Sequence, residues 1–229
     1  MKTFSDLEHT LGYSFQDKAL LQNALTHTSY ANEQFHSNQH LKSNERLEFV
    51  GDAVLGLIAG GYIYRKYPQM PEGKMSKLRA SVVCESMLAT LALRLHVDEF
   101  LRLGIGEEQT GGRKKPSLLA DAMESIIGAI YLEAGFEEIN KILLTHLAPE
   151  IEKRAEDTVG SDYKSRLQEL LGKKKMTASY EIVSATGPDH DREFTACATT
   201  SEGLTACGVG RSKKEAEQAA AKAVLMQME

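Results

Sequence analysis

Three carboxylates recur at helical spacing in one long apolar segment, residues 44–56. Glu45, Glu48 and Asp52 are separated by three and four residues, so a helix places all three on one face. Gly56 continues that face, and apolar residues cover most of the remaining circumference. We therefore expect a largely buried helix that holds its carboxylates in a partly desolvated site.

A second acidic stripe follows later in the chain. Asp121 and Glu124 are three residues apart, Gly128 extends their face, and the other sides of this segment are apolar. The sequence thus predicts two buried helices, each with an acidic face.

Such carboxylates would repel one another, and at least one would take up a proton near neutral pH unless a cation compensated them. Arg46 is the only base within the first stripe. Oxygen ligands without nearby histidine or cysteine favour Mg²⁺ or Mn²⁺, and such ions assist phosphodiester hydrolysis by activating water and stabilising the departing oxygen. Spacing alone leaves metal-assisted hydrolysis and a structural acidic cluster equally open.

The surrounding sequence predicts two domains of different class. In 229 residues with 42% hydrophobic content, apolar residues recur at three- and four-residue spacings through residues 4–155, which favours helices. The polar run 153–162, with Gly160, is interpreted as a linker. The predicted fold class is an all-α domain at residues 1–153, a linker at 154–161 and an α+β domain at 162–229.

The second domain is predicted from a change of periodicity. We expect a helix, three strands and an alanine-rich helix in the order αβββα, at residues 163–171, 178–185, 193–199, 204–209 and 213–228. A turn at residues 201–203 joins the last two strands.

Composition limits the location of the protein and its ligands. The net charge of −5 argues against nucleic acid, but acidic and basic residues balance from Ser161 onward. Cys84, Cys197 and Cys207 lack metal-ligand spacing, so we predict no disulfide framework or zinc site and a reducing cytoplasm. Cys197 and Cys207 can face one another across a hairpin, but two small, partly buried thiols are the preferred interpretation. The sequence predicts neither secretion nor a membrane span.

The first stripe resembles the signature of the ribonuclease III family, bacterial endonucleases of double-stranded RNA, which reads closely as NERLEFVGDAVLG at residues 44–56. The similarity continues at residues 71–76 and 111–124 and extends to the carboxyl terminus. Val50 stands where leucine is more usual, and Pro116 interrupts a basic loop that often continues without proline. Neither residue is a proposed ligand.

This resemblance implies a nuclease that uses Mg²⁺, with Mn²⁺ as a substitute. The implied metal ligands are Glu48, Asp52, Asp121 and Glu124, with Asp52 and Glu124 catalytic, while Glu45 and Glu72 assist at a second ion or the scissile phosphate. A cytoplasmic homodimer is implied, whose two sites cut opposite strands and leave 5′-phosphate and 3′-hydroxyl ends with short 3′ overhangs. Its implied role is the processing of ribosomal RNA precursors, messenger RNA and transfer RNA.

Residues 162–229 look like a double-stranded RNA-binding domain, with GPDH at residues 187–190 and RSKK at residues 211–214. Its candidate RNA-binding residues are Gln168, Glu169, His190, Lys213 and Lys214. The lysines at a helix amino terminus suit phosphates, and the other three suit 2′-hydroxyls and base edges in the shallow minor groove. The lysines at residues 173–175 either attract RNA diffusely or form a solvated helix end.

Several alternatives stay open from the sequence. Close packing of two subunits is one explanation for Phe49, Gly51 and Gly56, and a role in the core of one subunit explains them equally well. The glycine-rich run 104–112 lacks the Gly-Lys-Ser/Thr ending of a phosphate loop, so no nucleotide cofactor is expected. The following basic residues 113–115 are interpreted as a mobile loop that either contacts RNA or stays solvated.

Two other functional classes compete with the nuclease. In one, the second domain binds duplex RNA and the helical part only dimerises, which the intact acidic set argues against. In the other, a metal-dependent phosphohydrolase acts on small nucleotides, which the carboxyl-terminal domain argues against.

Overall fold

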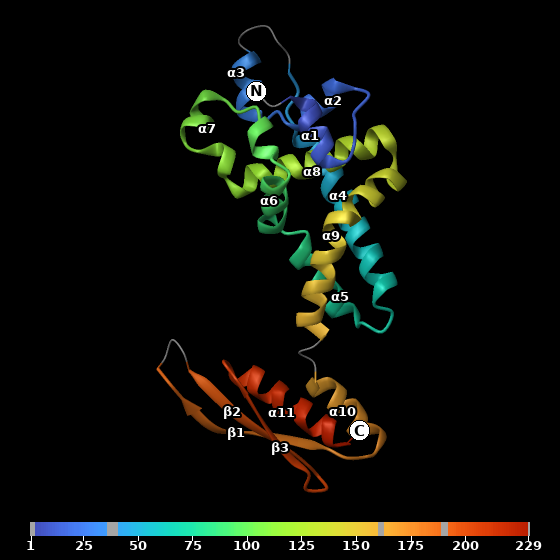
Figure 1. Ribbon diagram of the computed structural model, residues 1–229, viewed down its shortest axis with the longest axis vertical. Coiled ribbons are helices and arrows are strands. Elements are labelled where there is room, and N and C mark those ends of the chain that lie inside the picture. Colours follow the sequence, from blue (N-terminus) through green and yellow to red (C-terminus); the bar gives the residue numbers. More distant parts are fainter. Residues whose placement is uncertain (1–2, 36–40, 160–162, 189–191, 229) are drawn as a thin grey trace. The chain divides into compact units, whose positions relative to one another are not determined.

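The computed structural model describes residues 3–35, 41–159, 163–188 and 192–228. It divides into two compact units, Met1–Arg154 and Ala155–Glu229, and Figure 1 shows the elements of each.

The first unit is helical throughout its described residues, as the apolar spacing predicts. Its helices are α1 (Phe4–Leu11), α2 (Lys18–Ala24), α3 (Thr28–Phe35), α4 (Glu45–Lys66), α5 (Glu72–Val82), α6 (Glu85–Arg94), α7 (Ile105–Gln109), α8 (Pro116–Ala134) and α9 (Phe136–Val159), with short 3-10 turns η1 (Val97–Phe100) and η2 (Gly112–Lys114). The only β-pairing found in these residues is an isolated bridge between Thr26 and Arg102.

Helix α8 forms the centre of this unit. Pro116 occupies its first turn, where the missing N–H costs nothing, and the helix ends before Gly135. Buried side chains occur on all its sides, including Leu119, Ile126 and Ile130. Helix α8 packs most extensively against α4 and next against α6, so the prediction that it is a buried helix is confirmed.

Helices α4 and α8 touch backbone to backbone at two glycines. A Cβ atom at Gly51 would lie 1.8 Å from the carbonyl oxygen of Glu124, and one at Gly128 would lie 2.3 Å from the carbonyl oxygen of Leu47. Neither position therefore admits a side chain. A Cβ at Gly56, in contrast, would meet no atom within 4 Å, so of Gly51 and Gly56 only Gly51 has a packing role within the subunit.

The expectation that α4 is largely buried is wrong for one side of the helix. Leu55 and Ile58 are buried, but Phe49, Leu57 and Tyr64 are 80%, 61% and 70% exposed. The apolar circumference is thus divided between the core and an exposed stripe, a distinction that periodicity does not make. Among the described residues α4 alone is long and apolar enough to cross a membrane, by length and composition only; its packing against α8 is that of a core helix.

The first six residues of the predicted linker are helical, because α9 continues through Val159, and the division between the two units falls within that helix, after Arg154. Ile151 and Ala155 are both buried and lie four residues apart, so the apolar face of the helix extends into this polar run. Gly160, which suggested the hinge, lies outside the described residues.

The second unit confirms the αβββα prediction. It consists of α10 (Tyr163–Lys173), β1 (Ala178–Thr186), β2 (Glu193–Thr200), β3 (Thr205–Gly210) and α11 (Lys213–Met228), and its antiparallel sheet has the order β1-β2-β3. The core lies between the sheet and both helices, and its members include Leu167, Leu171, Ala196, Ala198, Ala220 and Val224. Small residues let α11 lie close to β3, because a Cβ at Gly208 would stand 2.3 Å from the amide nitrogen of Ala220.

The preferred interpretation of Cys197 and Cys207 as two free thiols is wrong. They are register partners on β2 and β3 with their Cα atoms 4.0 Å apart, and a disulfide joins them. Directly opposite residues of antiparallel strands bring their Cβ atoms close enough for such a bond. Cys84 is a free cysteine.

The α4–α8 contact leads to a first prediction. We expect Gly51→Ala and Gly128→Ala each to lower the free energy of unfolding by at least about 2 kcal/mol, because the added carbon must separate two backbones. Gly73→Ala is the control, since a Cβ there meets no atom within 4 Å, and it should change stability by less than about 1 kcal/mol. Urea unfolding of the three variants measures the difference; equal stabilities would contradict the packing role.

Candidate metal centre and nucleic-acid interface

Three carboxylates of the acidic stripes meet between α4 and α8. Glu48 of α4 and Asp121 and Glu124 of α8 each offer one carboxylate oxygen, and these oxygens all lie within 4.8 Å of one another. All three side chains are half-buried. The meeting follows from the glycine contact, because Gly51 lies one turn after Glu48 and rests directly on the backbone of Glu124.

Asp52 and Glu45 lie at the rim of this trio. Both are exposed residues of α4, and the charge of each raises the pKa of Glu48. Asp52 also raises the pKa of Glu124, which places it within electrostatic reach of both helices. Glu45 accepts a hydrogen bond from Ser43 Oγ at 2.6 Å.

Burial and mutual repulsion make the cluster hard to ionise. Burial is the largest cause that raises the pKa of Glu124 to about 7, and the charges of Asp52, Glu48 and Asp121 follow in that order. Burial likewise raises the pKa of Glu48 and of Asp121. The described part of the chain has no lysine or arginine in an ion pair with the trio, and Arg46 is exposed. Oxygen donors that lack a protein cation suit a hard divalent ion.

Glu72 is not brought to this cluster within the subunit. It begins α5, is exposed, and accepts a hydrogen bond from Ser76 Oγ at 2.7 Å. It borders a small cavity of about 290 Å³ that also includes Gly60 and Tyr64 of α4. At about 1.5 Å per residue, Gly60 lies roughly 18 Å along the helix from Glu48.

His27 is a neighbour of the site that the sequence reasoning missed. Its charge lowers the pKa of Asp121 and that of Glu107. Its Nδ1 lies 3.2 Å from the amide nitrogen of Ser29 and 2.8 Å from the Ser29 hydroxyl oxygen, and these contacts fix the orientation of the ring. No helical spacing links His27 to the acidic stripes, and only the fold brings this part of the chain to α8.

The basic loop before α8 is held in place rather than free. Arg113 pairs with Glu108 at 2.7 Å and donates to the carbonyl oxygen of Asp98 at 2.9 Å. Lys115 pairs with Glu107. Lys114 is exposed between them, so it presents its charge to solvent.

Four of the five candidate RNA-binding residues are exposed on the second unit. Gln168 and Glu169 lie on α10, and Lys213 and Lys214 form the first turn of α11. The α11 terminus is capped, because Ser212 Oγ accepts from the amide of Glu215 at 3.2 Å. The other candidate, His190, lies outside the described residues.

The comparisons with known proteins agree with this division into two units. A family model described as ribonuclease-III-like matches residues 17–151, and one described as a double-stranded RNA binding motif matches residues 163–228. The protein named Ribonuclease 3 from Oceanobacillus iheyensis is 50% identical over 96% of this chain and 95% of its own length. The protein of the same name from Listeria innocua is 44% identical over 100% of this chain and 99% of its own length.

Solved structures show the same similarity. The nuclease domain of ribonuclease III from Campylobacter jejuni, described for flexibility in a region involved in dimer formation, matches with a TM-score of 0.59 and 46% identity over 63% of this chain and 96% of that one. Dicer from Pichia stipitis matches with a TM-score of 0.50 and 26% identity, and the match covers 93% of this chain and 96% of that one. The chain therefore belongs to the ribonuclease III family of double-stranded RNA endonucleases, and it ends in a double-stranded RNA binding motif.

Proposed function

We propose that the chain hydrolyses both strands of double-stranded RNA at a centre where Glu48, Asp52, Asp121 and Glu124 hold Mg²⁺, with Mn²⁺ as a substitute. The products are 5′-phosphate and 3′-hydroxyl ends with short 3′ overhangs. The observation that supports this most strongly is the meeting of three half-buried carboxylates that pair with no lysine or arginine among the residues the structure describes. A bound divalent ion would supply an activated water and a counter-charge for the departing oxygen.

The half-buried and the exposed carboxylates have different proposed roles. Glu48, Asp121 and Glu124 surround a partly desolvated position in which electrostatic attraction for a cation is strong. Asp52 stands exposed at the rim, where water and the RNA backbone enter, and it orients the attacking water. Glu45 is placed beside Glu48 to assist at a second ion or the scissile phosphate.

A homodimer is proposed from the exposed stripe on α4. Phe49, Leu57 and Tyr64 form an apolar surface that a second copy can bury, and the relative from Campylobacter jejuni is described as having a region involved in dimer formation. The proposed role of Glu72 requires such a partner, because Glu72 of α5 lies beside Gly60, which is roughly 18 Å along α4 from Glu48.

The second unit is proposed to hold the duplex. Lys213 and Lys214 place side-chain charge at the positive end of the α11 dipole, which suits phosphates, while Gln168 and Glu169 suit the 2′-hydroxyls of a minor groove. His190, in the GPDH motif at residues 187–190 of the sequence, keeps its proposed role. In the cell we expect this recognition to serve the processing of ribosomal RNA precursors, messenger RNA and transfer RNA in the cytoplasm.

Cleavage and binding should separate on mutation. We expect Asp52→Asn and Glu124→Gln to lower cleavage of end-labelled duplex RNA in Mg²⁺ by at least about a hundredfold, because each removes a ligand charge. Duplex binding in Ca²⁺ should stay within a factor of about two, since phosphate contacts lie on other residues. Glu137→Gln, at an exposed carboxylate of α9, is the control that keeps full turnover.

Mapping of the product ends in the same assay tests the chemistry, with Ca²⁺ and chelator as controls. Staggered cuts with 5′-phosphates are expected from the unaltered protein. Full turnover in both amide variants would refute the site, and binding without cuts under any metal would leave a duplex-binding protein.

The stability of the metal-free protein should fall as the pH rises. The folded-state pKa of Glu124 is raised from 4.5 to about 7, so its stabilising contribution is complete below pH 4.5 and is lost as the pH passes 7. From pH 4.5 to 8, the free energy of unfolding should decrease relative to that of Glu124→Gln by an amount on the order of 1 kcal/mol. Mg²⁺ should reverse the loss in the unaltered protein only. If urea unfolding gave the unaltered protein and Glu124→Gln parallel profiles of stability against pH, the raised pKa of Glu124 would be contradicted.

The α11 lysines should account for part of the salt dependence of binding. We expect replacing Lys213 and Lys214 with alanine to weaken duplex binding and to reduce the slope of log affinity against log salt by about 2. Lys141→Ala, at an exposed position of α9, is the control with the slope unchanged. A titration series at four salt concentrations measures the slope, and an unaltered slope in the double variant removes both lysines from the phosphate contacts.

A further inference from the structure

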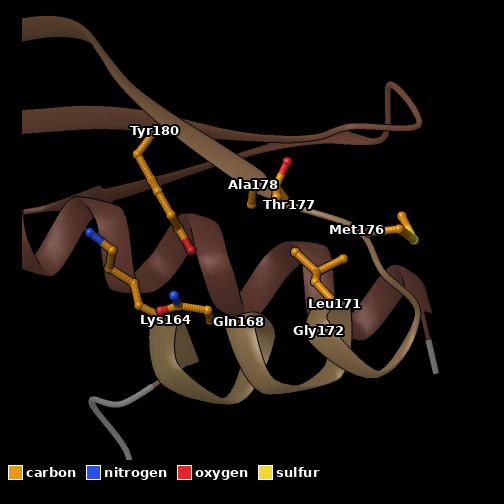
Figure 2. A pocket seen from close by; sticks show the side chains of 8 residues that line it. All are labelled: Lys164, Gln168, Leu171, Gly172, Met176, Thr177, Ala178 and Tyr180. Atoms are coloured by element: carbon orange, nitrogen blue, oxygen red, sulfur yellow. The ribbon is translucent and has the colours of Figure 1, made fainter.

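A cavity of about 490 Å³ lies in the second unit between α10 and the start of β1. Figure 2 shows Tyr180 extending from the strand toward the helix, with Lys164 and Gln168 on the helix beside it. Leu171 points from the helix toward the strand, and Thr177 completes the opposite wall. The volume falls in the range of about 300–1,000 Å³ that is typical of small-ligand pockets.

The lining favours a flat ligand without charge. The Lys164 ammonium lies 4.2 Å from the centre of the Tyr180 ring and 2.7 Å from a carboxylate oxygen of Glu217. Its charge is thus compensated, so the cavity does not concentrate phosphate. Lys164 covers one face of the Tyr180 ring and the ring packs against the core. The part of Tyr180 that lines the cavity is joined by the apolar Leu171 and by the amide of Gln168, which both donates and accepts hydrogen bonds.

The cavity is continuous with the proposed RNA-binding surface, because Gln168 belongs to both. A duplex lying along α10 would bring its minor groove to the mouth of the cavity. Paired bases are held in the stack and do not enter such a space, whereas an unpaired base at a bulge or loop is free to turn outward. Aromatic side chains and hydrogen-bonding edges are the features by which proteins receive unpaired bases.

We propose that this cavity receives an unpaired nucleobase of a structured RNA, an inference that rests on the proposed binding of duplex RNA by the second unit. The protein then prefers duplexes interrupted by an unpaired nucleotide at a fixed distance from the bound region. Shape recognition by α10 and α11 is supplemented at this one position by recognition of a base.

Gly172 offers a way to fill the cavity without disturbing the rest of the unit. It lines the cavity, and a Cβ there would meet no heavy atom within 4 Å. Gly172→Leu places a side chain in the space proposed for the base, and Gly172→Ala adds a single methyl group as the matched control. Both should raise the thermal midpoint slightly, because glycine is unfavourable in a helix.

The test uses the full chain in chelator, so that RNA is bound but not cut. Affinities are measured for one continuous duplex and for a series with a single unpaired 2-aminopurine at successive positions. We expect one position to bind about five- to tenfold more tightly than the continuous duplex, with a change in fluorescence as the base leaves the helical stack and enters the cavity. Gly172→Leu should abolish that preference and the fluorescence change while binding the continuous duplex normally, and Gly172→Ala should retain most of both.

Three results would overturn the inference. If the unaltered protein binds the continuous duplex but prefers no unpaired position, the cavity receives no base. If the preference persists in Gly172→Leu, the base binds elsewhere. If the unaltered protein binds neither RNA, the proposed function of the second unit fails, and the inference fails with it.

Discussion

Repulsion among carboxylates is the constraint around which the first unit is organised. Glu48 on α4 and Asp121 and Glu124 on α8 are brought within 4.8 Å of one another, although burial and like charge oppose their ionisation. The apolar packing of α4, α6 and α8 supplies the stability that offsets this cost. A divalent cation would relieve this repulsion, which is why these oxygen donors suit such an ion.

The sequence was sufficient where a local pattern carries the information. Carboxylates three and four residues apart within apolar surroundings predicted both acidic helices, and the trio confirms that they face one another. The change from helical to alternating periodicity predicted the αβββα order of the second unit. Both patterns depend on neighbours within one or two turns of chain, and such patterns are readable without coordinates.

The missing features all depend on contacts between distant segments. His27 lowers the pKa of Asp121 only because the fold brings α8 beside it. The spacing of residues along the sequence does not predict this contact. From the sequence alone, an apolar residue such as Phe49 fits a position in the core and a position on an exposed surface equally well. The bond between Cys197 and Cys207 depends on the register of β2 against β3, and the extension of α9 past Arg154 depends on the burial of Ala155.

The contact at Gly51 and Gly128 also restricts how this centre can change during evolution. Side-chain clashes in a core are commonly relieved by a second substitution nearby, but here the obstructing atoms are the carbonyl oxygens of Glu124 and Leu47, which every amino acid carries. No single compensating replacement removes them. Drift at these positions would require the two helices to separate, and the separation would pull the carboxylates of opposite helices apart. Divergence of specificity is therefore directed to surfaces away from the crossing, where residues vary without altering the geometry of the metal centre.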